Sequence, residues 1–151
     1  MILNFEVLNA FFLIKKVHMV ISVAFLIVAV WLIIRSIRGI IRKVPYSGLD
    51  KFLSYGFIIN LYIQLIFGLV LFLNPDLAVD QNLSGPDGAL KIASNRFWPI
   101  EHIVLMLFAL FIANLGFVFS NQSRLSRDKH SKILTYYVFA LCMIAISLIA
   151  I

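Results

Sequence analysis

Residues 17–34 read VHMVISVAFLIVAVWLII, a run in which only His18 and Ser22 are polar. An α-helix rises about 1.5 Å per residue, so a run of this length comes close to crossing the roughly 30 Å hydrocarbon core of a bilayer. Three further apolar runs follow at residues 55–73, 98–119 and 133–151. Each is predicted to be helical, because unpaired backbone groups are costly in lipid. The sequence therefore predicts an all-α integral membrane protein, with a single up-down four-helix bundle over residues 1–151.

The composition also indicates a bilayer as the solvent. The 151 residues are 62% hydrophobic and 13% charged, and the mean hydropathy is +1.01. One small water-soluble core could not bury this much apolar surface. The net charge of +6 arises mainly in short gaps between apolar runs, a pattern that orients membrane helices. We therefore expect the lipid bilayer as a partner and no nucleic acid.

The basic residues predict which way the helices run. The gap at 35–51 carries five of them and the gap at 124–132 carries four, together nine of the 13 in the chain. Positive residues favour the cytoplasmic side, so an even number of spans places both termini on the periplasmic side of a bacterial inner membrane. The link at 74–95, rich in turn-forming residues, is then the one sizeable outer element, and it could carry a short interfacial helix around 89–94. Pro99 suits the first turn of the third helix.

Three other features carry expectations of their own. The leading segment 1–14 is expected to be an interfacial lead-in or a helical extension of the first span. Cys142 lies in an apolar run and is expected to be a buried, inert thiol. His130, among charged residues of the gap at 124–132, is expected to be solvated.

Two histidines inside the apolar runs are the main candidates for function, because ionisable groups in a membrane are costly. His18 lies at the start of the first span and His102 near the start of the third. These two spans run in the same direction, so both imidazoles are expected at a similar depth near the outer surface. Two imidazoles that face each other across a bundle are the axial ligands that a six-coordinate haem iron needs. The alternative is a pair of ordinary interfacial histidines, each with one hydrogen bond.

The residues around the pair are compatible with a cofactor. Helical spacing places Ser22 below His18 and Met106 below His102, within stripes of small side chains that would leave room for a flat macrocycle. Such stripes are equally typical of closely packed membrane helices. Lys15 and Arg96 are placed at the rim, where haem propionates would emerge, or where basic side chains simply extend to the interface.

Two short segments resemble a known family. Residues 100–106 read IEHIVLM, with a Glu-His pair opening the third span, and residues 62–68 read YIQLIFG. With His18 at the start of the first span, the chain resembles small four-helix bacterial membrane proteins of the cytochrome B type. The resemblance covers most of the chain and implies haem b and electron transfer. In that family a further histidine often stands where this chain has Tyr62, which leaves His18 and His102 as the ligand pair that the resemblance implies.

Other functions remain open at the level of sequence. The chain could be a cofactor-free accessory subunit of a larger respiratory or other membrane complex. It could handle copper through His18, His102 and Met106, because copper accepts both imidazole and thioether ligands. It could also be a four-helix oxidase of porphyrin precursors, so whether it is an enzyme is left open. Polar residues of the second span, such as Gln64, are expected to bond between helices, with a quinone headgroup as a weaker alternative.

Overall fold

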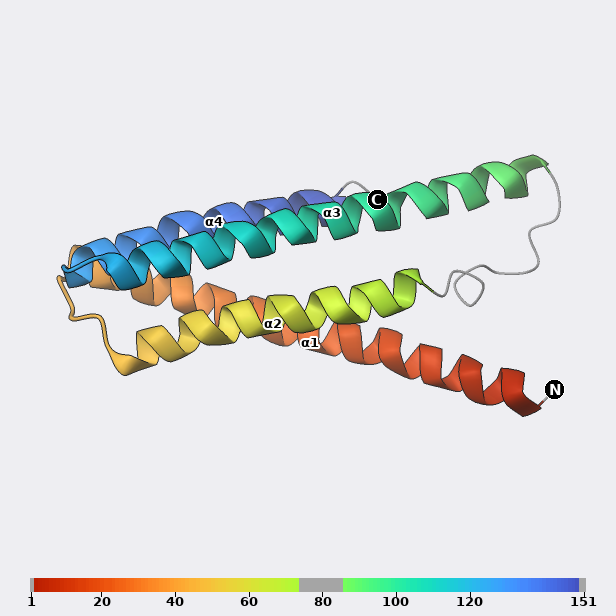
Figure 1. Cartoon of the computed structure of the whole chain (residues 1–151), viewed down its shortest axis with the longest axis horizontal. Coiled ribbons are helices and arrows are strands. Elements are labelled where there is room, and N and C mark those ends of the chain that lie inside the picture. The colour runs from red at the N-terminus through yellow and green to blue at the C-terminus, as the bar shows by residue number, and fades with distance from the viewer. Residues whose placement is uncertain (1, 74–85, 150–151) are drawn as a thin grey trace.

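The computed structural model describes the backbone of residues 2–73 and 86–149, and the side chains of residues 9, 12–73 and 100–148. The described part is all-helical. It consists of α1 (Ile2–Ile41), α2 (Gly48–Phe72), α3 (Pro86–Gln122) and α4 (Ser126–Ile149). Figure 1 shows the four helices running alternately up and down along one long axis. The all-helical fold predicted from the sequence is therefore confirmed.

Each helix contains a stretch that is long and apolar enough to cross a membrane. The stretches are Phe12–Ile41, Gly48–Phe72, Ile100–Gln122 and Ser126–Leu148. They include nearly all of the four predicted spans and are longer, because the helices continue through most of the charged gaps. Only 42–47 and 123–125 remain as non-helical links at one end of the bundle. We call this end the basic end and the opposite end, with His18 and His102, the histidine end.

Two predicted boundaries were wrong at the histidine end. Residues 86–95, predicted as part of a separate outer link that could carry a short helix at 89–94, form the first turns of α3, while 74–85 lies outside the described residues. Pro99 was predicted in the first turn of a helix and instead lies within α3. The first helical position is taken by Pro86, where the missing N–H costs nothing. The segment 2–14 continues α1, so the alternative of a helical extension is confirmed.

The order in which the helices contact one another fixes which faces can meet. α1 packs on α2 and α4, and α3 also packs on α2 and α4. α1 and α3 therefore stand at opposite corners of the bundle. In Figure 1 these two helices diverge towards the end at which the chain begins.

A column of aromatic rings forms the centre of the core. The Phe25 and Phe57 ring centroids are 4.8 Å apart, and Phe57 stacks on Tyr137 at 4.3 Å. The Tyr137 hydroxyl donates a hydrogen bond to the carbonyl oxygen of Ser54 at 3.1 Å, so this buried polar group is satisfied. Alanines complete the core where two helices approach closely, because a small side chain keeps the backbones near. The buried ones are Ala29, Ala109, Ala113 and Ala140.

The outside of the bundle is apolar along its length. Large hydrophobic side chains such as Ile27, Ile66 and Phe111 are more than half exposed, and they occur on every helix. An exterior of this kind is stable against lipid and unstable in water. Cys142, predicted to be buried, belongs to this exposed surface. The prediction was wrong because an apolar run that crosses lipid places apolar residues on its outer face as well.

Candidate functional site: two histidines at one cavity

The structure brings His18 and His102 to one cavity of about 90 Å³ between the helices. Its lining also includes Ser22, Phe25, Gln64 and Met106. Most of the lining surface is apolar. His18 belongs to α1 and His102 to α3, the two helices that stand at opposite corners of the bundle.

His102 is held by a residue of α4. Its Nδ1 lies 3.1 Å from the hydroxyl oxygen of Ser147. That hydroxyl donates its single hydrogen to the carbonyl oxygen of Ile144 at 2.7 Å. A serine hydroxyl has only one hydrogen to donate but can also accept. The histidine therefore donates from Nδ1, and the lone pair of the neutral ring lies on Nε2.

His18 is held mainly through its backbone. Its carbonyl oxygen accepts a hydrogen bond from the Ser22 hydroxyl at 2.8 Å and one from the Gln64 side-chain amide at 3.4 Å. The second bond joins α1 to α2 at the level of the site, as expected for a polar residue of the second span. The Gln64 side chain also lies near the His18 ring, although among the described residues the buried Nδ1 of His18 and Oε1 of Gln64 form no well-aligned hydrogen bond.

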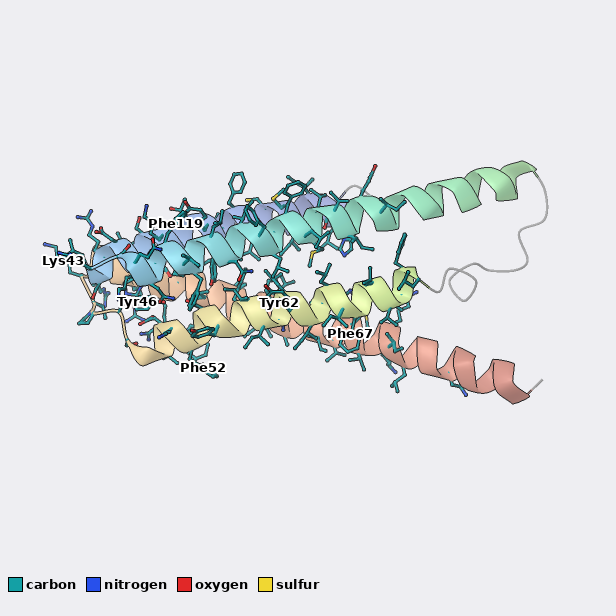
Figure 2. All side chains as sticks on the ribbon, in the orientation of Figure 1. Lys43, Tyr46, Phe52, Tyr62, Phe67 and Phe119 are labelled. Carbon is teal, nitrogen blue, oxygen red and sulfur yellow. The ribbon has the colours of Figure 1, made fainter. Side chains whose placement is uncertain are left out.

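The other candidates take different places. Met106 is buried and lines the cavity, and Ser22 is half-buried beside it. Lys15 is exposed and does not line the cavity. Arg96 belongs to α3, but its side chain lies outside the described residues. Tyr62, near the middle of α2 in Figure 2, is 47% exposed and contributes nothing to the cavity.

Ser147 was missed by the sequence reasoning, which assigned no ligand role to the last span. The available signal was its position: α4 runs opposite to α3, so a serine near the end of α4 faces a histidine near the start of the apolar part of α3. A lone serine in an apolar helix is common enough that only the pairing of α3 with α4 makes it informative.

A second polar cluster lies at the basic end, where Lys43 and Tyr46 are labelled in Figure 2. Asp50 is only 1% exposed. It accepts hydrogen bonds from Arg35 Nε at 2.6 Å and from the Ser47 backbone N–H at 2.8 Å. The Tyr46 hydroxyl lies 3.2 Å from that of Ser54, and burial raises the pKa of Tyr46 above its usual value. These contacts join α1 to the beginning of α2.

His130 belongs to this cluster, and its predicted solvation was wrong. It is 1% exposed, and its ring packs edge-on against Tyr46 at 5.0 Å. The ring also lies directly on Gly39 of α1, where a side chain would collide with it. The surrounding charges in the sequence suggested a loop, but the first turn of α4 turns this one position towards α1. We assign His130 to packing, because its ring fills the space between Tyr46 and Gly39.

No group of three or more His, Cys, Asp or Glu side chains that could hold a metal ion occurs among the described residues. A comparison with known protein families, characterised proteins and solved structures finds no match to the chain. The likeness to cytochrome B-type proteins thus rests on the short segments around Gln64 and His102, and the cofactor stays a prediction.

Proposed function

We propose that this chain is a membrane-bound electron-transfer protein that holds one b-type haem between His18 and His102. The observation that carries the proposal is the pair of imidazoles on diagonally opposite helices at one apolar cavity. Axial ligands approach a haem iron from opposite faces, so helices at opposite corners are suited to supply them. The absence of a three-residue metal cluster among the described side chains is compatible with this ligand set, because the porphyrin would supply the other four donors.

The chemistry of the donors fits a haem, while the size of the cavity requires movement. A volume of about 90 Å³ is well below the roughly 300 to 1,000 Å³ of typical cofactor sites. Binding therefore needs the ends of α1 and α3 to separate at the histidine end. Three of the helices are loosely packed there: among the described side chains, none before Phe25 in α1, after Gln64 in α2 or before Met106 in α3 is buried. Among the same described side chains, only α4 keeps buried ones at this end, Ile144 and Ser147.

The histidines and the apolar lining would then have different roles towards the haem. His18 and His102 would ligate the iron, and the apolar lining would exclude water and so help to set the potential. When bound, such a haem supplies a one-electron couple between ferrous and ferric iron. We also propose the orientation that the basic links indicate, with the histidine end on the periplasmic side of a bacterial inner membrane.

The test is a spectrum of the protein purified in detergent from haem-sufficient cells. We expect a Soret band and sharp α and β bands on reduction, and we expect His102→Ala to remove them. Ser123→Ala is the matched control, because Ser123 lies at the basic end and its hydroxyl likewise donates to a backbone carbonyl, that of Phe119. A haem-free spectrum of folded protein would refute the proposal.

A single copper ion is the second candidate, and the cavity volume favours it. His18, His102 and Met106 line the same space, and about 90 Å³ suits an ion better than a macrocycle. Imidazole and thioether together are typical copper ligands. Metal analysis separates the two candidates, and so does Met106→Leu: this change should leave a bis-histidine haem in place but weaken copper binding at least tenfold. If neither metal is found and the protein co-purifies with a stable partner, the alternative of a cofactor-free accessory subunit gains support.

A further inference from the structure

The two histidines differ in how they are supported. His102 Nδ1 is bonded to Ser147 on a neighbouring helix, whereas the buried Nδ1 of His18 forms no well-aligned hydrogen bond among the described residues. A histidine that ligates a metal through Nε2 usually donates its Nδ1 hydrogen to an acceptor, which fixes the tautomer and the orientation of the ring. His102 has such an acceptor at hydrogen-bond distance, whereas the Gln64 side chain lies near the His18 ring without a well-aligned bond.

We propose that Ser147 is a positioning residue that holds His102 as the Nδ1–H tautomer, and that His102 is consequently the permanent ligand of the site and His18 the exchangeable one. The part that concerns the metal centre rests on the proposed function. The part that concerns the tautomer does not, because it follows from hydrogen bonds within the protein.

The position of the Ser147 hydroxyl hydrogen decides the tautomer of His102. If Ser147 donated to His102 instead, its oxygen and the Ile144 carbonyl oxygen would face each other at 2.7 Å with no hydrogen between them. Two acceptor oxygens repel at that distance, which is the usual length of an O–H···O hydrogen bond. The hydrogen of Ser147 therefore belongs to Ile144, and His102 is the donor in the other bond.

The hydrogen bond to Ser147 also fixes the direction of the Nε2 lone pair of His102. With Nδ1–H tied to α4, the lone pair on Nε2 is at the opposite side of the imidazole, and His102 lines the cavity. The hydrogen bond also makes the ring a stronger base towards a metal. The Gln64 side chain already lies near the His18 ring, but its Oε1 and the His18 Nδ1 form no well-aligned hydrogen bond. Without such a bond, His18 can leave a metal more easily than His102, whose Nδ1 is bonded to Ser147.

The first arm of the test needs no cofactor. Nitrogen-15 and carbon-13 spectra of histidine-labelled apoprotein at pH 8 distinguish Nδ1–H from Nε2–H imidazole, and His102 is assigned by its absence in His102→Ala. We expect the Nδ1–H form at His102 in the wild type and in Ser147→Thr, which keeps a hydroxyl. Ser147→Ala should lose it, and the control Ser123→Ala, at the basic end of the bundle, should keep it. An Nε2–H form in the wild type, or an Nδ1–H form that persists in Ser147→Ala, would overturn the assignment.

The second arm uses haem-loaded protein. Loss of an outer hydrogen bond to a metal ligand typically lowers affinity about 10- to 100-fold, so Ser147→Ala should lose haem that much more readily than Ser147→Thr. His18→Ala should retain a five-coordinate, high-spin haem, while His102→Ala should retain none. Equal retention in the two histidine variants would refute the ranking of the ligands. If the wild type carries no haem, the proposed function fails, and the apoprotein spectra still decide the role of Ser147.

Discussion

Replacing Asp50 by Asn tests whether the buried cluster at the basic end stabilises the bundle. The change keeps the size of the side chain, so it creates no cavity, but it removes the negative charge. The carboxylate accepts four hydrogen bonds: from Arg35 Nε and Nη2 at 2.6 and 3.0 Å, and from the Ser47 N–H and hydroxyl at 2.8 and 2.6 Å. An amide has one oxygen, so at least one of these donors would face an NH₂ group.

The expected cost follows from those contacts. Leaving one member of a buried ion pair without its partner costs about 3 to 5 kcal/mol. The Arg35 side chain is 27% exposed, so water offsets part of the loss and the lower end of that range applies. We expect Asp50→Asn to lower the free energy of unfolding by about 3 kcal/mol, which changes the unfolding equilibrium more than a hundredfold.

The measurement is reversible unfolding by SDS in mixed detergent micelles, followed by helical circular dichroism. Asp128→Asn is the matched control, because Asp128 is exposed in the first turn of α4, where losing a carboxylate costs under about 1 kcal/mol. In a double-mutant cycle, Arg35→Gln with Asp50→Asn should be less destabilised than the sum of the single variants. If Asp50→Asn unfolds at the same SDS fraction as Asp128→Asn, the cluster contributes no stability and the reasoning is wrong.

Three further predictions concern packing and orientation. Gly39→Ala should destabilise by about 1 to 3 kcal/mol in the same SDS assay, because the new methyl group meets the His130 ring; wild-type stability would contradict this contact. Gly116→Ala should lower the free energy of unfolding at least as much, since its methyl group meets the Tyr136 Cβ, which cannot rotate away. Gly56→Ala is the control for both, because a methyl group there meets open space. Alkaline phosphatase fused to the C-terminus should be active and green fluorescent protein fused there should be dark, because the basic links favour the cytoplasm; the opposite pattern would invert the bundle.

The helices could be predicted from sequence because their cause is local. Apolar length alone identifies runs such as 17–34, and lipid leaves a helix as the stable backbone form. The residues at which the helices end depend on more distant contacts. Pro99 was predicted in the first turn of a helix, but α3 begins at Pro86. Whether a helix continues through a proline depends on the residues that surround it.

The candidate site was only partly accessible from sequence. The shared direction of the first and third spans suggested that His18 and His102 lie at one level, and the structure brings them to one cavity. The support from Ser147 could not be predicted, because it depends on which face of α4 meets α3. His130 shows the same limit: its charged neighbours indicate solvent, and one helical turn directs the ring onto Gly39 instead.

The central claim is that His18 and His102 together ligate one haem iron, and electron paramagnetic resonance of the oxidised protein tests it most directly. With haem content measured in parallel, the account predicts one haem per chain and a low-spin ferric signal typical of two imidazole ligands. His18→Ala should convert that signal to high spin. A protein without haem, or a low-spin signal that is unchanged in His18→Ala, would contradict the account.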